Sequence, residues 1–396
     1  MKTLFALALV LVLSHQMLVA QRTQTLEVRF CPDSVMYVYE EMGPASSKQL
    51  FTGLIQNMAF VNTTDKPVII QNVKINSVKG AHILQTKWLS RASILRQAAQ
   101  MHAMKEQGLL DLYDFQFQTS RYLKGVPLSA SDTLKAGEAI IVMHEVLLFD
   151  ELPERVEVVI EGKTFQGATI TSSGQLTVSN YKSKNSYNLP LKGRWMAAAA
   201  PSLVAHHRWA SVQEFAFDFI KTGHDLSSYR NSGTNLTDYY AYAESVYAIG
   251  DGTVVSVLDE VEEPVDNLKK ATETEEAYFA RVQAHQQALM KKGFTYIFGN
   301  HVIIRHPHGE YSMYFHLKRG SVAVKAGDKV KEGQQIGALG HSGNSTEPHL
   351  HFHVSNSADI LYSRSLPVVF NNIKLYPDDS GQVRHLHTGQ IIVAVD

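Results

Sequence analysis

Histidine occupies every second position at the end of the segment GNSTEPHLHFHV, residues 343–354. The Asn, Ser and Pro residues before the histidines predict a turn. Because strand side chains alternate between two faces, the pattern predicts a short strand with His349, His351 and His353 on one face and an apolar core on the other. Alternate side chains lie roughly 6.5–7 Å apart, so a metal bound by His351 would have His349 beside it. Buried imidazoles are costly without partners, which favours a site over a chance run of histidines.

An acid and two histidines upstream could complete a set of metal donors. Asp218 interrupts the phenylalanines of FAFDF, residues 215–219, so on a strand it faces away from them. His206 and His207 precede it across an expected loop. Either histidine, with Asp218 and His351, offers two nitrogens and one oxygen and leaves a fourth tetrahedral position for water, as catalytic zinc requires. Many His and Asp pairs lie on the surface, and the spacing by itself leaves that alternative open.

The segments around these residues predict a compact antiparallel sheet. Residues 300–320 predict a hairpin whose returning strand carries His316, on the face opposite Phe315 and Leu317. Four glycines within residues 327–340 predict tight turns between short strands, because glycine adopts backbone angles that other residues avoid. The whole region therefore predicts a barrel-like arrangement of strands that carries the histidines.

The N-terminal part of the chain predicts a separate β-rich domain without chemistry. Between residues 26 and 178, short segments of alternating apolar residues are separated by turn signals, which is typical of an antiparallel β-sandwich. Residues 87–112 contain neither Gly nor Pro before Gly108 and predict one inserted helix. We find no candidate catalytic group here and expect a packing or targeting module.

The length of 396 residues exceeds one ordinary core and predicts two domains. We place the β-rich N-terminal domain at residues 21–191 and the second domain at residues 192–396. Within the second domain, residues 262–292 are charged and rich in Ala, Gln and Lys, which predicts a helical insertion.

The first residues resemble a targeting segment rather than part of the fold. Lys2 is followed by an apolar run that is too short to span a bilayer, and Ala20 is a plausible cleavage point. We therefore expect a secretory signal peptide at residues 1–20, with a retained membrane anchor as the alternative. No later segment is long and apolar enough to cross a membrane, so no stable membrane span is expected.

The composition limits the kinds of partner and functional site that this chain could have. A formal net charge of -1 and a charged content of 19% argue against a nucleic-acid partner. The 18 histidines and the single cysteine favour imidazole and carboxylate chemistry over thiolate sites. Cys31 has no partner within the chain, so an internal disulfide is excluded.

Together these segments resemble the lysostaphin/LytM-type zinc metallopeptidases, which cut peptide bridges in bacterial cell walls. The resemblance covers most of residues 195–354 and is strongest from Gly299 onward. That part contains a returning strand with a histidine, a V-x-x-G-x-x-V-x-x-G-Q-x-I-G pattern and a terminal HxH. Biotinyl and lipoyl carriers share a similar glycine pattern, but they need a lysine on a hairpin tip, where this chain has the HxH strand.

The resemblance implies a role for each residue that matches the family's motif. His351 corresponds to a zinc ligand and Asp218 to the carboxylate ligand. His316 and His349 correspond to the catalytic pair.

The first zinc ligand departs from the family's HxxxD spacing, because Glu214 stands where the ligand is expected. Some relatives carry a longer loop before the aspartate, which favours His207, with His206 as the alternative. His224 with Asp225 is a less favoured choice.

The implied function is a secreted or periplasmic zinc endopeptidase acting on peptidoglycan cross-bridges or stem peptides. Zinc lowers the pKa of its bound water to about 7, and His316 and His349 would move protons and stabilise the oxyanion. Glu347 and His353 depart from the family's usual glycine and acid or amide, and we expect them to affect substrate preference.

Two other functions remain open from the sequence. A weak or inactive relative could bind cell wall or activate another hydrolase, although such proteins typically lack several site residues that are present here. A carrier or sugar-binding β-protein is the third reading.

Overall fold

The computed structural model describes residues 25–41, 50–202, 205–270, 272–376 and 385–395. The predicted signal peptide, residues 1–20, lies outside them. In the described part of the chain, no helix is both long enough and apolar enough to cross a membrane.

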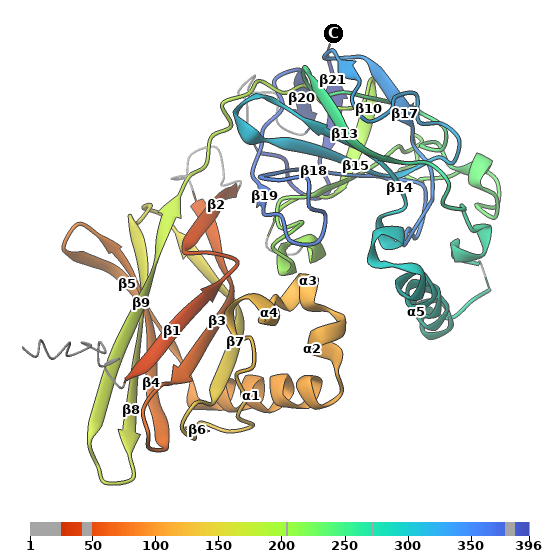
Figure 1. The fold of residues 1–396 in the computed structure, drawn as a ribbon. Coiled ribbons are helices and arrows are strands. Elements are labelled where there is room, and N and C mark those ends of the chain that lie inside the picture. The colour runs from red at the N-terminus through yellow and green to blue at the C-terminus, as the bar shows by residue number, and fades with distance from the viewer. Residues whose placement is uncertain (1–24, 42–49, 203–204, 271, 377–384, 396) are drawn as a thin grey trace, which may run out of the picture.

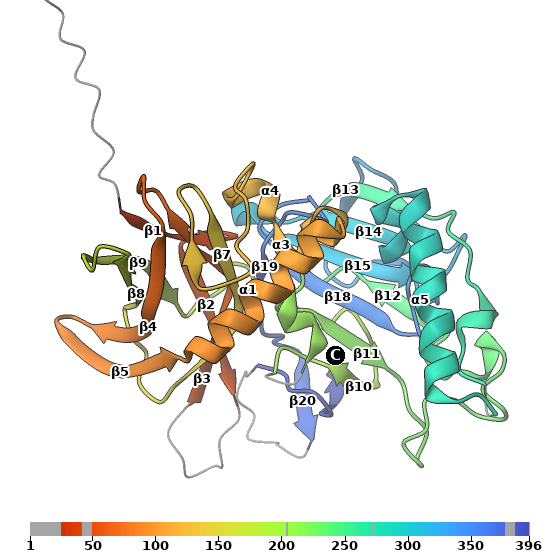
Figure 2. The same ribbon diagram turned by 90° about the horizontal axis from the view of Figure 1, so that it is seen from below.

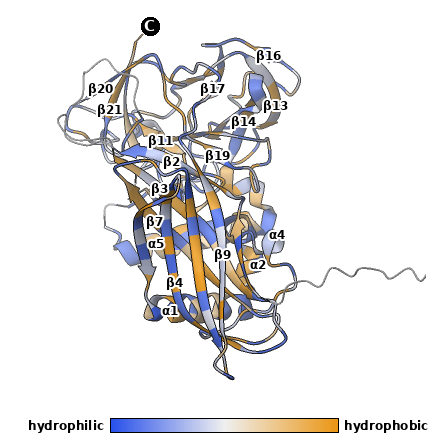
Figure 3. Cartoon of the chain, turned by 90° about the vertical axis from the view of Figure 1, so that its left-hand side faces the viewer, coloured by the Kyte–Doolittle hydropathy of each residue, from blue (hydrophilic) through white to orange (hydrophobic). Residues whose placement is uncertain are grey.

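Nine strands form the N-terminal sheet (Figure 1). They are β1 (Leu26–Cys31), β2 (Val35–Glu41), β3 (Leu50–Asn62), β4 (Val68–Lys79), β5 (His82–Leu89), β6 (Thr133–Leu134), β7 (Ala139–Phe149), β8 (Arg155–Thr164) and β9 (Thr169–Ser179). Bands of hydrophilic and hydrophobic residues follow one another along β4 (Figure 3). The alternation that the sequence shows in this region therefore corresponds to strands with one face toward a core.

The N-terminal sheet consists of two halves that share one core. β1, β3, β2 and β7 form one half, and β9, β8, β4, β5 and β6 form the other. Buried apolar residues of both halves, such as Phe60 and Val158, belong to one cluster, which agrees with the predicted sandwich-like architecture. One detail differs from the prediction of a purely antiparallel domain. β2 and β9 pair in parallel, and this pair joins the two halves through a long crossover in the chain.

The single helix predicted at residues 87–112 is wrong at its start and near its end. β5 continues to Leu89, and α1 (Arg91–Glu106) begins after Ser90, whose side chain accepts a hydrogen bond from Ser93 N. Gly108 has a φ of 72°, in the left-handed region, and this angle ends the helical geometry of the preceding segment. Three short helices follow, α2 (Leu109–Leu112), α3 (Asp114–Phe117) and α4 (Thr119–Tyr122).

The C-terminal sheet has ten strands in the order β16-β13-β14-β15-β18-β11-β10-β21-β20, with β19 paired to β18. These strands are β10 (Arg194–Ala199), β11 (Phe217–Ile220), β13 (Gly252–Leu258), β14 (Asn300–Arg305), β15 (Tyr311–Leu317), β16 (Lys329–Val330), β18 (Leu350–Ser355), β19 (Ser365–Leu366), β20 (Ile373–Tyr376) and β21 (Ile391–Ala394). β12 (Ser245–Tyr247) and β17 (Gln335–Ala338) form a separate pair. Every strand pair is antiparallel, so the predicted compact antiparallel sheet is confirmed. The domain boundary at residue 191 stays a prediction.

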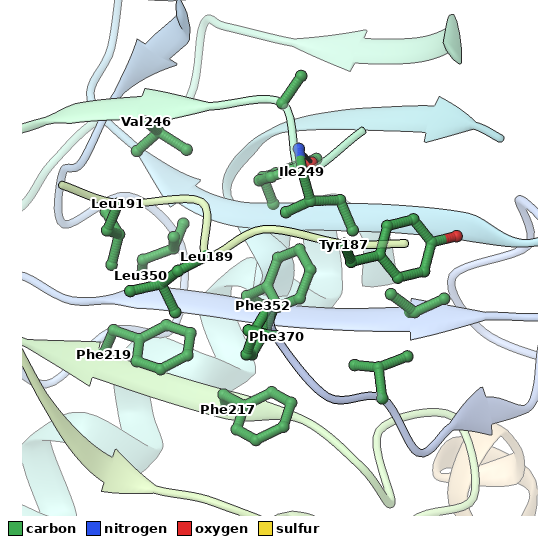
Figure 4. Packing of buried hydrophobic residues seen from close by; sticks show 14 of the residues in the cluster. Tyr187, Leu189, Leu191, Phe217, Phe219, Val246, Ile249, Leu350, Phe352 and Phe370 are labelled. Atoms are coloured by element: carbon green, nitrogen blue, oxygen red, sulfur yellow. Dashed lines mark hydrogen bonds between the residues drawn. The ribbon is translucent and has the colours of Figure 1, made fainter. Parts of the chain in front are cut away.

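The two central strands of this sheet, β11 and β18, each have one apolar face and one polar face. Figure 4 shows Phe217 and Phe219 of β11 packed with Leu350 and Phe352 of β18 in the main core. The residues between them, including Asp218, therefore face the other side of the sheet.

The predicted helical insertion at residues 262–292 contains one long helix in its second half. η3 (Val265–Asn267) comes first, and α5 (Glu275–Lys292) begins after Thr274, whose hydroxyl accepts a hydrogen bond from Ala277 N. η4 (Phe294–Phe298) leads into β14. In Figure 2, β18 is seen between α1 of the N-terminal part and α5 of the insertion.

The segment that connects the two sheets is held by one buried carboxylate. Glu310 accepts hydrogen bonds from the hydroxyls of Tyr181 and Tyr187, each at 2.5 Å. It also accepts bonds from Ser183 Oγ and Asn185 Nδ2, each at 2.8 Å. These donors alternate along an extended segment, so the connection is fixed to the C-terminal sheet rather than free. Burial raises the pKa of Glu310, but these four donors outweigh it and hold the pKa below its ordinary value.

We expect Glu310→Gln to lower the free energy of unfolding by about 1–3 kcal/mol, because an amide cannot accept all of these bonds. The lowered pKa means that the carboxylate's contribution is complete above the ordinary glutamate pKa of 4.5 and is lost as the pH falls through the folded value. Urea unfolding near neutral pH and again near pH 4 measures both effects, and the difference between variant and wild type should shrink at the lower pH. Glu332→Gln is the control, because Glu332 accepts an exposed bond from Asn188. An equal loss in both variants would contradict the expectation.

Candidate active site

The carboxylate of Asp218 is the point on which the candidate site converges. Its residue is 9% exposed. Asp218 Oδ2 lies 2.7 Å from His207 Nε2, and Oδ1 lies 3.0 Å from His351 Nδ1. Two further imidazoles are slightly more distant, with His349 Nε2 at 3.7 Å from Oδ1 and His206 Nε2 at 3.9 Å from Oδ2. Residues far apart in the sequence thus meet around one acid.

Strand register brings the acid and the HxH segment together. Asp218 of β11 is directly opposite His351 of β18. His207 comes from η1 (His206–Trp209), a short turn between β10 and β11. The expected loop before the aspartate strand is therefore a turn that reaches back to it.

Both candidates for the first ligand lie near Asp218, but they differ in burial. Donor atoms of His206, His207 and Asp218 all lie within 4.8 Å of one another. The side chain of His207 is 7% exposed and that of His206 is 71% exposed. Asp225, in the less favoured choice, accepts a bond from the backbone of Ser227 in its own turn. Burial and the direct contact favour His207, and the assignment stays a prediction.

His316 and His349 face each other beside this group, with ring centroids 4.8 Å apart. His349 Nδ1 lies 2.8 Å from the carbonyl oxygen of Glu347, and His316 Nδ1 lies 2.8 Å from that of Ser342. A carbonyl oxygen can only accept, so Nδ1 carries the hydrogen in each ring and Nε2 is left as the proton acceptor. Burial holds the pKa of His316 well below its ordinary value, which keeps this ring neutral.

The predicted orientation of Phe315 is wrong. We expected it opposite His316, but its ring lies 5.7 Å from that of His351 and 5.6 Å from that of His353, on the site face. The cause is the backbone of His316, whose φ of 59° lies in the left-handed region and breaks the alternation of β15. Leu317 then returns to the core. Such strained residues are concentrated at functional sites, and residue-by-residue alternation cannot predict them.

His353 lies behind the candidate ligand rather than in contact with solvent. It is 3% exposed, and its Nδ1 lies 3.3 Å from His351 Nε2. Burial holds the pKa of His353 well below its ordinary value. Its position favours a role in orienting His351 over the expected effect on substrate preference. The HxHxH alternation already placed it on this face.

Two residues to which the sequence analysis gave no role in the site support His349. His341 is fully buried, and its Nδ1 lies 2.9 Å from Ser345 Oγ. Ser345 Oγ donates to the carbonyl of Glu347 at 2.7 Å and lies 3.3 Å from His349 Nδ1. The sequence feature that could have indicated His341 and Ser345 is their position in the turn before the HxH strand.

A cleft of about 440 Å³ opens onto the candidate site. It is lined by His207, Asp218, His316, His349 and His351, together with Tyr113, Phe115, Trp209, Phe294 and Phe298. The aromatic residues come from α3 and the residue before it, from η1 and from η4. Phe115 of the N-terminal part and Phe294 of the insertion have ring centroids 5.4 Å apart. The N-terminal part therefore contributes to the cleft, which a purely packing or targeting module would not do.

The donor set fits a divalent metal such as zinc. Burial raises the pKa of Asp218, but His207 and His349 nearby outweigh this and hold the pKa well below its ordinary value. All ion-pair partners of Asp218 among the described residues are histidines. Burial, followed by the effect of His207, lowers the pKa of His351 to about 4, so this imidazole is neutral, as a metal ligand must be. Two imidazole nitrogens and one carboxylate oxygen are a typical catalytic zinc set.

Comparison with known families supports the resemblance inferred from the sequence. The model of peptidase family M23 matches residues 279–361, so the predicted resemblance is confirmed for this segment. The matched segment contains His316, His349 and His351, whereas His207 and Asp218 lie before it.

Curated relatives match over short segments. The peptidoglycan DD-endopeptidase ShyC of Vibrio cholerae is 45% identical over 62 residues, which cover 16% of this chain and 14% of that protein. The cell division protein DipM of Caulobacter vibrioides is 44% identical over 55 residues, covering 14% of this chain and 9% of DipM. This chain thus spans about one seventh or less of the length of these two relatives.

Solved structures match more weakly. The lysostaphin catalytic domain of Staphylococcus simulans is 20% identical, covering 44% of this chain and 88% of that domain, with a TM-score of 0.24. A zinc-containing peptidase of Vibrio cholerae is 13% identical, covering 80% of this chain and 81% of that one, with a TM-score of 0.21. Scores this low carry no argument about the site.

We expect His207→Ala to abolish tight zinc binding, because the remaining Asp218 and His351 are too few protein ligands to hold zinc well. His206→Ala should retain near-stoichiometric zinc, since its side chain is largely exposed. Elemental analysis of both variants, purified in parallel without added metal, measures the difference. Loss of zinc only from His206→Ala would reverse the assignment.

Proposed function

Because residues 279–361 match peptidase family M23, we propose that this protein is a zinc endopeptidase that cleaves peptide bonds of peptidoglycan. One observation carries the proposal. Asp218 is buried between His207 and His351, and the paired rings of His316 and His349 line the same cleft. This arrangement combines a metal donor set with two imidazoles that can transfer protons.

The substrate class follows from the relatives. ShyC and ShyA of Vibrio cholerae are named peptidoglycan DD-endopeptidases, and the segments shared with this chain are 45% and 44% identical. The shared segments are short, so they support a common type of chemistry rather than a common whole protein. A peptidoglycan substrate implies action in the periplasm or outside the cell, in agreement with the signal peptide predicted at residues 1–20.

Each side chain has a defined task in this proposal. His207, Asp218 and His351 would hold the zinc ion, which when bound acts as a Lewis acid and activates water. The Nε2 atoms of His316 and His349 can accept a proton from the attacking water and donate one to the leaving amine. A protonated Nε2 can also donate a hydrogen bond to the developing oxyanion.

Hydrogen bonds and packing hold the two proton-transferring rings in place. The carbonyl oxygens of Glu347 and Ser342 fix the tautomer of His349 and His316. Ser345 adds a contact to His349 Nδ1. The aromatic residues around the cleft, such as Trp209 and Phe298, reduce access of bulk water and offer flat apolar surfaces to a peptide. The rings therefore need little rearrangement when a substrate binds.

We expect His349→Ala and His316→Ala to lower the turnover of purified sacculi by at least about a hundredfold while zinc content stays near wild type. Neither ring belongs to the proposed ligand set, so the metal should remain. Release of soluble muropeptides gives turnover, and elemental analysis with the melting temperature checks the metal and the fold.

The control is His102→Ala, because His102 is remote in sequence and bonds the carbonyl of Leu128 in the N-terminal part. Normal turnover in both site variants would refute the catalytic roles. Wild-type protein that binds zinc and sacculi but releases no fragments would instead indicate a non-catalytic wall-binding relative.

A further inference from the structure

The turn that carries His207 is held by the other half of the molecule. Gln56 of β3 donates from Nε2 to the carbonyl oxygen of Arg208 at 2.8 Å. His144 of β7 donates from Nε2 to the carbonyl oxygen of Trp209 at 3.0 Å. These carbonyls belong to the two residues directly after His207. Among the described residues, the other backbone hydrogen bonds of η1 are local to the turn.

The side chain of Arg208 strengthens this connection. It is 2% exposed, and its Nη1 donates to Thr52 Oγ1 of β3 at 2.9 Å. Its Nη2 lies 3.5 Å from the buried carboxylate of Glu214, in the C-terminal part. A buried guanidinium is costly unless it is paired. Because Arg208 takes partners from both parts, the position of η1 depends on how the two parts fit together.

Backbone geometry points to the same contact. His144 has a φ of 56° and Gln118 a φ of 51°, both in the left-handed region that non-glycine residues rarely adopt. Gln118 is fully buried and donates from Nε2 to Ser211 Oγ at 2.7 Å, just after η1. Strained residues of this kind persist where the surrounding structure requires them. Here both of them hold the segment that follows His207.

We propose that the N-terminal β-domain is a structural part of the metal site. Through β3 and β7 it fixes η1 and so positions His207, and the affinity for zinc therefore depends on contacts between the two domains. Gln56, His144 and Thr52 are positioning residues in this scheme. The inference rests on the proposed function, because it takes His207 as a zinc ligand. Such coupling is reciprocal, so zinc must stabilise the contact between the domains by the same factor.

The test measures zinc affinity in the full chain, by competition with a chromophoric chelator. Gln56→Leu removes the donor to the Arg208 carbonyl at nearly constant volume, and we expect it to weaken zinc binding by about tenfold, as for other groups that orient a ligand. Gln85→Leu is the matched control, because Gln85 Nε2 donates to the carbonyl of Leu148 at 2.8 Å within the N-terminal sheet. The control should bind zinc as the wild type does.

A second measurement tests the reciprocal effect without any reference to activity. Amide hydrogen exchange is followed across β3 with and without zinc. In the wild type, zinc should slow exchange in β3 near Gln56, and in Gln56→Leu this effect should largely disappear. Exchange in β5, around Gln85, should not respond to zinc in either protein.

The outcomes separate this inference from the proposed function. If the wild type does not bind zinc, the proposed metal site is wrong. If the wild type binds zinc and Gln56→Leu binds it equally well, the domain coupling is wrong while the proposed function stands. If Gln56→Leu does not fold, Thr52→Val decides, because it keeps the shape of the side chain and removes the hydroxyl that accepts from Arg208 and donates to Glu41. Zinc affinity equal to that of the wild type in this variant would overturn the coupling.

Discussion

A carboxylate removed from water must be compensated, and the candidate site is organised around this requirement at Asp218. Its contacts are with imidazoles rather than with lysine or arginine. Burial lowers the pKa of His351, so this ring is neutral and offers Asp218 a hydrogen bond rather than a positive charge. A divalent cation held by the carboxylate and this ring would add the positive charge that the ring does not supply. The register of β11 against β18 and the placement of η1 can be understood as the means of bringing donors to one acid.

The sequence predicted those parts of the site that depend on local alternation. The HxHxH pattern correctly placed His349, His351 and His353 together, and the phenylalanines around Asp218 correctly indicated which way the acid faces. Alternation failed at Phe315 because one left-handed residue, His316, reverses the order of the faces. Histidine is enriched at such angles among non-glycine residues, but most histidines do not adopt them, so the residue type does not tell which histidine will.

Contacts between distant segments were beyond the reach of sequence patterns. Gln56 and His144 lie in strand sequences where we expected no chemistry, yet they bond the turn beside His207. The helical segment is a second example. Gly108 indicates where a helix ends, but nothing in the sequence indicates that Phe115 lines the cleft. Hydrogen bonds between residues that are 152 and 65 positions apart depend on the arrangement of whole sheets, and neither composition nor periodicity indicates them. The roles of the site residues themselves remain predictions.

The Nδ1 hydrogens of His316 and His349 point at backbone carbonyls, and this limits how protons can travel. A carbonyl oxygen accepts a hydrogen bond but does not take up a proton and pass it on. The His316 ring, whose Nδ1 bonds the carbonyl of Ser342, therefore cannot serve as a link in a relay that runs through the protein interior. A proton that arrives at Nε2 must also depart from Nε2, either to a bound molecule or to water in the cleft. Over successive turnovers this ring therefore depends on the cleft for exchange of protons with the solvent.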